Sequence, residues 1–144
     1  MTTFLLDVNV LIARLDPAHV QHDAAHECFG AHGHKACATC PLTENGVLRI
    51  VGHARYPNSP GTPSAVMSLM ATLRSLPGHV FWPDDISLME AQRIDATRLL
   101  NTAQVTDSYL LALACAHEGQ LASFDRRLVT DAVRGGARRL HLIR

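Results

Sequence analysis

Residues 4–16 read FLLDVNVLIARLD, an apolar run that is followed directly by a carboxylate at Asp7. The run before Asp7 predicts a short buried strand, and VNVLIARL at 8–15 continues with the apolar spacing of a helix. Asp7 therefore lies at the junction of a strand and a helix. Its side chain suits capping of that helix, but an acid at the end of a buried strand also suits ligand binding. Both interpretations stay open at this point.

Outward from this stretch, short apolar strands alternate with helical segments along the whole chain. The first helix ends at Asp16-Pro17, because proline disfavours helix in the residue before it. Alternation of this kind predicts an α/β domain with a mainly parallel sheet, and 144 residues suit a single domain spanning 1–144. We expect further strands at 35–40, 79–82, 120–124 and 140–143, and further helices at 19–32, 41–54, 63–76, 86–101 and 105–119.

Apolar spacing also predicts which helical residues face the core. The helix at 19–32 is expected to end at Gly33. The segment at 86–101 is helix-like, although Ile86, Met89 and Ile94 follow an irregular period. The inward residues expected elsewhere are Val20, Ala24, Cys28 and Phe29 in the helix at 19–32, and Val66, Leu69, Met70 and Leu73 in the helix at 63–76.

The overall charge does not indicate a partner, because acidic and basic side chains balance at 13 each. Locally, six arginines lie between Gln120 and Arg144, which suits either phosphate contact or a solvated surface. The longest apolar run, LLALACA at 110–116, is too short to span a bilayer, and no targeting signal is visible. Four cysteines without an export signal indicate reduced thiols in a cytoplasmic protein.

Asp125 repeats the local design of Asp7, because it follows the apolar strand expected at 120–124 and precedes a turn. In open α/β sheets, ligands bind in the crevice beyond the carboxyl ends of the strands. Two acids delivered there from neighbouring strands would converge. For each acid taken alone, helix capping remains the alternative.

Asp107 and Glu44 are two further acids that lie near helix starts on apolar faces. Asp107 shares a face with Leu110, Leu111 and Ala114, and Thr106 is placed to cap that helix. An acid in a first turn complements the helix dipole, yet a buried charge needs a partner. No basic residue lies within one turn of Asp107 in the sequence, and the base nearest to Glu44, Arg49, falls across its helix.

Four inward acids without evident basic partners would repel one another in a crevice, and a divalent cation removes that repulsion. Oxygen ligands without histidine or cysteine favour Mg²⁺ or Mn²⁺ over zinc. Such a site suits phosphoester hydrolysis, in which metal ions activate water and stabilise the leaving oxygen. The pattern of acids therefore predicts Asp7 to be a metal ligand.

Four motifs, in order along the chain, resemble those of PIN-domain ribonucleases, and more narrowly the VapC-type toxins of bacterial toxin–antitoxin pairs. They are LLDVNVLIA at 5–13, TENGVLRI at 43–50, VTDSYLLALA at 105–114 and SFDRRL at 123–128. The resemblance implies a PIN-like three-layer α/β/α domain with a central parallel sheet. It also implies Mg²⁺-dependent endonuclease action on RNA, with transfer or ribosomal RNA as the substrate, and products that carry 5′-phosphate and 3′-hydroxyl ends.

The same resemblance assigns roles to individual residues and implies partners. Asp7 and Asp107 match the most direct metal ligands of the family, and Glu44 and Asp125 match the acids that complete the pocket. A homodimer is implied, with a cognate antitoxin that obstructs the acidic pocket in a heterotetramer or larger assembly. Polar neighbours of the acids match at Asn9, Thr106 and Ser123, and the arginines placed to contact RNA are Arg126 and Arg127.

Two other readings compete with the nuclease. Segment 22–40 is rich in histidine and cysteine, which raises a zinc-binding module. Against zinc, Cys37 and Cys40 fall on an expected strand, where residues three apart face opposite sides. A PIN-like interaction protein without catalysis is the second alternative, although a scaffold of that kind has no need of clustered acids.

Overall fold

In the computed structural model, which describes residues 2–31 and 36–144 and the side chains of all these except 27–31, five strands form one parallel sheet. The order is β3-β2-β1-β4-β5, so the first strand lies at the centre. The predicted α/β class with a parallel sheet is thus confirmed. The strands are β1 (Thr3–Leu6), β2 (Ala36–Thr39), β3 (His79–Phe81), β4 (Gln120–Ser123) and β5 (Leu140–Leu142).

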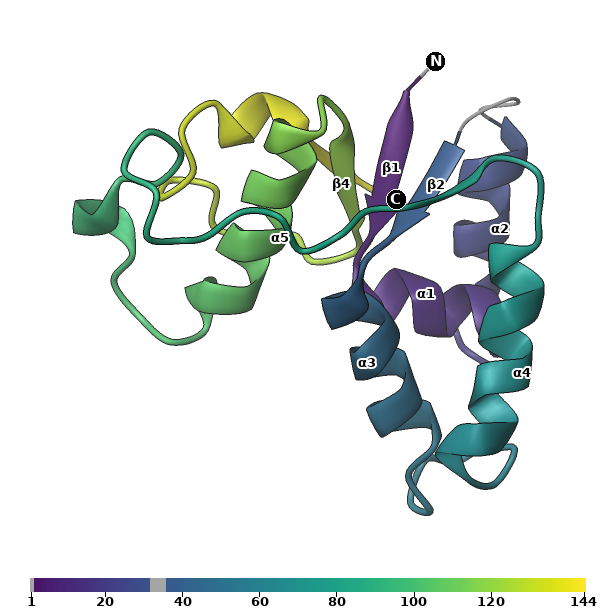
Figure 1. The fold of residues 1–144 in the computed structure, drawn as a ribbon. Helices are drawn as coiled ribbons and strands as arrows, with labels where there is room; N and C mark the ends of the chain where they lie inside the picture. The colour runs from purple at the N-terminus through teal and green to yellow at the C-terminus, as the bar shows by residue number, and fades with distance from the viewer. Residues whose placement is uncertain (1, 32–35) are drawn as a thin grey trace.

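Helices cover both faces of this sheet, as Figure 1 shows, with α5 on one side and α1 to α4 on the other. Alternation along β1 explains the layers, because Phe4 and Leu6 pack against the first four helices while Leu5 packs against α5. The expected three-layer arrangement is therefore confirmed. The helices are α1 (Val8–Leu15), α2 (His22–Ala31), α3 (Pro41–Val51), α4 (Pro63–Arg74) and α5 (Gln104–Ala116).

The helix expected at 86–101 is wrong. This segment consists of turns, an isolated antiparallel bridge between Ile94 and Val133, and the short 3₁₀ helix η1 (Ala96–Arg98). The backbone N–H of Asp95 donates to the carbonyl of Ala132 at 2.8 Å, and that of Arg134 donates to the carbonyl of Arg93 at 2.9 Å. Hydrogen bonds to the segment at 132–134 thus replace those of a helix.

Two of the expected inward residues are also wrong. Val20 is 94% exposed, because α2 begins only at His22 and leaves Val20 in the preceding turn. Leu69 is 39% exposed, since the buried stripe of α4 is narrower and consists of Val66, Met70 and Leu73. Ala24 does pack against the core. The predictions for the side chains of Cys28 and Phe29, and for a helix end at Gly33, lie outside the description.

Among the described residues, no helix combines the length and the apolar character that a membrane crossing requires. A second 3₁₀ helix, η2 (Gly136–Arg139), leads into β5 and contacts α5.

Candidate active site

Asp7 lies where the central strands β1 and β4 end side by side. Leu6 is paired with Ala122, and the N–H of Asp7 donates to the carbonyl of Ala122 at 3.1 Å. One carboxylate oxygen of Asp7 accepts from the N–H of Val8 at 2.8 Å, and the other accepts from the hydroxyl of Ser123 at 3.0 Å. The side chain is therefore held by both strand ends.

Asp125 is joined to Asp7 through the same hydroxyl. Its N–H donates to the Ser123 oxygen at 3.0 Å, and its carboxylate accepts from the N–H of Arg127 at 2.8 Å. A turn follows Asp125 rather than a helix, so the capping alternative does not apply to it. Ser123, fully buried at the end of β4, thus sets the spacing between the two acids.

Asp107 approaches the same point from the opposite layer. It lies in the first turn of α5 and is half-buried, above the buried side chains of Leu110 and Leu111. Burial, with the negative charges of Asp7 and Asp125, raises the pKa of Asp107 to about 6. Burial and the charge of Asp125 also raise the pKa of Asp7, against hydrogen bonds from Ser123 and Val8 that lower it. Asp7, Asp107 and Asp125 are called the aspartate cluster below.

Glu44 has different surroundings. Its carboxylate accepts from the hydroxyl of Thr39 at 2.7 Å and lies 3.4 Å from a guanidinium nitrogen of Arg74. The expectation that Glu44 lacks a basic partner is therefore wrong, because Arg74 reaches it from α4. The Arg74 side chain is 45% exposed, so solvent screens this pair and keeps it weak.

His79 extends the group around Glu44. The Thr39 hydroxyl donates to Glu44 and lies 2.8 Å from Nε2 of His79, which is therefore the donor in the second hydrogen bond. Burial and the nearby charge of Arg74 lower the pKa of His79, while Glu44 raises it. Thr39 ends β2 and His79 begins β3. This group therefore belongs to the two strands on one side of β1, whereas Asp7 and Asp125 follow β1 and β4.

The donors in the aspartate cluster are the ones that a hard divalent ion prefers. Three carboxylates converge, and burial, with a further contribution from neighbouring carboxylates, raises the pKa values of Asp7 and Asp107. No basic side chain forms an ion pair with any of the three within the described residues. Among the side chains that the structure describes, at 2–26 and 36–144, no group of three acidic, histidine or cysteine residues is placed to hold a metal ion as it stands. The chemistry of the cluster fits Mg²⁺ or Mn²⁺.

Comparison with known proteins gives several similar ribonucleases of Mycobacterium tuberculosis. The chain is 41% identical to Ribonuclease VapC44 over 138 residues, which cover 96% of both proteins. It is 41% identical to Ribonuclease VapC39 over 133 residues, and 38% identical to Ribonuclease VapC38 over 129 residues, covering 92% and 89% of this chain. No family model matches the chain. The chain belongs to the VapC ribonuclease family.

The fold of this VapC chain is also similar to a solved structure described as a toxin-antitoxin complex from Klebsiella pneumoniae. The TM-score is 0.54 with 20% sequence identity, and the match covers 85% of this chain and 87% of the other. At that identity the likeness shows the shared fold. It agrees with the three layers that the sequence predicts.

The remaining predicted polar residues of this VapC chain lie in less constrained positions. Asn9 and Thr106 are exposed, and Thr106 is inside α5 rather than at its cap, because the helix begins at Gln104. Arg126 and Arg127 are exposed beside Asp125. Ser123, in contrast, is central to the site.

Sequence reasoning missed Thr39, Arg74 and His79 as neighbours of Glu44. Thr39 carried a usable signal, because it is a polar residue near the carboxyl end of the strand predicted at 35–40, where ligands bind in open α/β sheets. Arg74 and His79 carried none, since they are 30 and 40 residues from the groups they contact.

The zinc hypothesis for segment 22–40 receives no support from the described residues. Cys37 packs in the core beside α1, while Cys40, which lies beyond β2 at the start of α3, packs in the core beside α5. Part of the segment, 32–35, lies outside the description.

Proposed function

We propose that this chain is an Mg²⁺-dependent endoribonuclease that hydrolyses RNA phosphodiester bonds, and that it is the toxin of a type II toxin–antitoxin pair. The observation that carries the proposal is the convergence of Asp7, Asp107 and Asp125 without basic partners among the described residues. Membership of the VapC ribonuclease family supports the reaction class.

The aspartate cluster would hold the metal ion, with Mn²⁺ as a substitute for Mg²⁺. Ser123 orients one oxygen of Asp7, while the other oxygen accepts from the N–H of Val8 at the start of α1. Glu44 would complete the site from the first turn of α3, positioned by the hydroxyl of Thr39 at the end of the neighbouring strand β2. A divalent ion supplies positive charge for the transition state and makes a water molecule more acidic. Arg126 and Arg127 would contact the RNA backbone, and Asn9 and Thr106 would serve as polar neighbours of the acids.

The first test is the substitution Asp7→Asn, which keeps the shape of the side chain and removes its charge. Cleavage of a mixed RNA substrate with Mg²⁺ should fall by more than about 100-fold, because even the partners of metal ligands typically contribute roughly 10- to 100-fold. Asn retains an oxygen for the Ser123 hydroxyl, so circular dichroism should show an intact fold.

The matched control is Asp23→Asn, an equal change of charge at an exposed residue of α2. This variant should cleave at the rate of the unsubstituted protein. If Asp7→Asn also kept that rate, Asp7 would not be a metal ligand and the proposed mechanism would be wrong.

We also propose that the chain binds a cognate antitoxin that obstructs the aspartate cluster, and that it forms a homodimer. Exposed apolar side chains on α3 and α4, including Ile50, Met67 and Leu69, are available for protein contact. Light scattering after gel filtration should give twice the mass of the chain. Transfer or ribosomal RNA as substrate would place the reaction in the cytoplasm.

A further inference from the structure

Two adjoining hollows lie beside the start of α5. The first encloses about 340 Å³ between the loop at 97–101, Gln104 and the segment at 129–131. The second encloses about 230 Å³ and reaches Arg138. Arg98 and Asp131 line both hollows, and the two neighbouring hollows are together called the Arg98 groove below.

The walls of the Arg98 groove lead directly to the aspartate cluster. Gln104 lines the groove and Asp107 lies three residues further along α5, a rise of about 4.5 Å on the same side of the helix. The opposite wall is the segment that contains Asp131, and the same segment begins at Asp125. A strand of RNA held at the cluster can therefore continue into the groove.

The groove is formed in advance by hydrogen bonds of the buried Gln104 side chain. Its oxygen accepts from the N–H groups of Leu100 and Asn101 at 2.7 and 3.1 Å, and its nitrogen donates to the Arg98 carbonyl at 3.2 Å. These bonds fix the loop on the first turn of α5. The entropic cost of ordering this wall when a ligand binds is therefore small.

The lining suits a nucleotide base more than a bare phosphate. Among the described residues, neither the side-chain amide of Asn101 nor the carboxylate of Asp131 has a hydrogen-bond partner, and both residues are exposed. Carboxylates and amides pair with the edges of bases, whereas Asp131 would repel a phosphate. Leu100 and Val129, 79% and 40% exposed, offer apolar surface for the face of a base.

Arg98 supplies the complementary contact. Its side chain is 62% exposed, and its only ion pair among the side chains that the structure describes is a 3.4 Å contact with Asp95. A solvent-screened pair of this kind is weak, so the guanidinium can turn to a phosphate. Single-stranded RNA is commonly recognised in this way, with the base in a pocket and the backbone on a cation.

We propose that the Arg98 groove is a base-recognition subsite for one nucleotide of the RNA strand beside the cleaved bond. Asp131 and Asn101 contact the edge of the base, and Arg98 contacts a phosphate. The proposal rests on the proposed ribonuclease function, because it assumes that the strand crosses the aspartate cluster.

The first experiment measures binding without catalysis. Four RNA pentamers that differ only at the central base are titrated, in EDTA, with protein that carries Asp7→Asn. Fluorescence anisotropy should show a preference for one base. Adding Asp131→Asn or Asn101→Ala should reduce that preference by about tenfold, which is the scale of one well-made base contact. Arg98→Gln should weaken the binding of all four pentamers about equally. It should also lower the magnitude of the slope of log affinity against log salt concentration by about one.

Asp23→Asn is the control, since it removes one exposed charge away from the groove. A base preference unchanged from this control in both Asp131→Asn and Asn101→Ala would overturn the proposal. So would equal affinity of the starting protein for all four pentamers.

A second experiment separates this proposal from the proposed function. Protein with Asp7 intact cleaves a randomised RNA pool with Mg²⁺, and the fragment ends are sequenced. Asp131→Asn should change the base favoured beside the cut while cleavage continues. If the protein with Asp7 intact binds with the expected preference but does not cleave, the ribonuclease proposal fails and the groove stands. If cleavage proceeds and Asp131→Asn leaves the favoured base unchanged, the groove fails.

Discussion

At the scale of single residues, Asp7 combines two roles that the sequence presents as alternatives. One oxygen accepts from the N–H of Val8 at the start of α1, and the other accepts from Ser123 on β4. Capping thus occupies one oxygen of the carboxylate, and the other oxygen lies on the side of Ser123 and the aspartate cluster. The same hydroxyl of Ser123 also accepts from Asp125, so a single buried group positions two acids.

Asp107 gives a pH-dependent prediction for the protein without metal. Its pKa of about 6 in the folded chain lies above its ordinary value of 3.8, so folding favours the protonated form. The stability that this group contributes is present in full below about pH 4 and is lost as the pH rises through about 6. Asp107→Asn imitates the neutral form. In EDTA at pH 8 it should raise the melting temperature by roughly 4 °C, as about 1 kcal/mol does in a chain of this size.

The difference should largely disappear at about pH 3.5, where Asp107 is protonated in both the folded and the unfolded chain. Thermal melts at the two pH values, with Asp23→Asn measured alongside, provide the check. An equal effect of Asp107→Asn at both values would show that its carboxylate is not repelled by the cluster.

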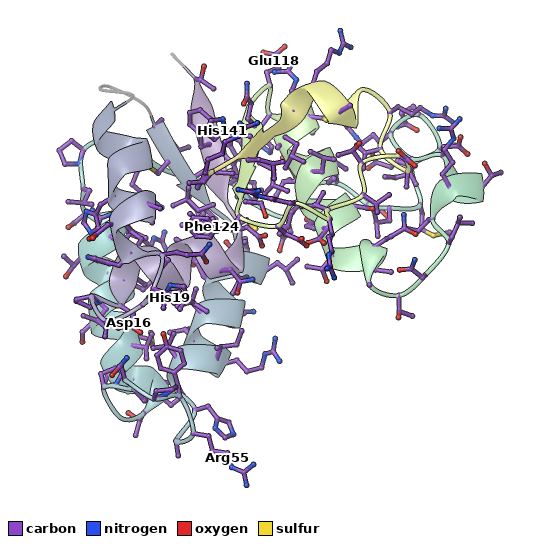
Figure 2. All side chains as sticks on the ribbon, turned by 180° about the vertical axis from the view of Figure 1, so that it is seen from behind. Asp16, His19, Arg55, Glu118, Phe124 and His141 are labelled. Carbon is purple, nitrogen blue, oxygen red and sulfur yellow. The ribbon has the colours of Figure 1, made fainter. Side chains whose placement is uncertain are left out.

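At the scale of elements, two neighbouring residues, Glu118 and Gly119, together end α5. The N–H groups of Glu118 and Gly119 donate to the carbonyls of Cys115 and Ala114 at 3.1 and 2.9 Å, the pattern of a Schellman motif. Glu118 takes the left-handed conformation, with φ of 56°. Figure 2 shows this residue at the edge of the molecule, far from Phe124 at the other end of β4. The sequence predicts the stop at Gly119, but the strained residue is Glu118.

Substitutions at the two positions should therefore have opposite effects. Glu118→Gly should stabilise the chain by about 1 kcal/mol, because glycine adopts a positive φ without strain. Gly119→Ala should destabilise it by about 2 kcal/mol through overpacking. An added Cβ would lie 2.6 Å from both the Thr3 carbonyl and the Trp82 ring. Urea denaturation measures both changes, and a loss of stability in Glu118→Gly would contradict the assignment.

At the scale of the whole molecule, strand order places the acids. The chain moves from β1 to β2 on one side of the sheet centre and later returns to β4 on the other side. A crevice forms beyond the carboxyl ends of strands where the direction of winding changes in this way. Asp7 and Asp125 follow β1 and β4, and α5 brings Asp107 from the layer opposite α1. Figure 1 shows α5 and α1 on opposite sides of the sheet.

Binding of a divalent ion at this end of the sheet should stabilise the whole fold. At pH 8, Mg²⁺ at 100 times its dissociation constant should raise the free energy of unfolding by about 2.7 kcal/mol. The effect should shrink below about pH 6, as Asp107 becomes protonated. Melting curves with and without the ion measure it. An equal shift in the Asp7→Asn variant would place the ion elsewhere.

The sequence by itself determined the order of strands and helices, apart from 86–101, and the positions of Asp7 and Asp125 at strand ends. Apolar periodicity carries that information within a short window, and parallel strands deliver their carboxyl ends to one edge of a sheet. Only the tertiary structure decided that Arg74 pairs with Glu44, and that residues 93–95 bond to 132–134 instead of forming a helix. These contacts join residues 30 or more positions apart, so no local pattern encodes them. The aspartate cluster depends on the sequence pattern and on the tertiary structure together. The pattern predicts which acids belong to the cluster, and the packing of α5 against β1 and β4 brings these acids close to one another.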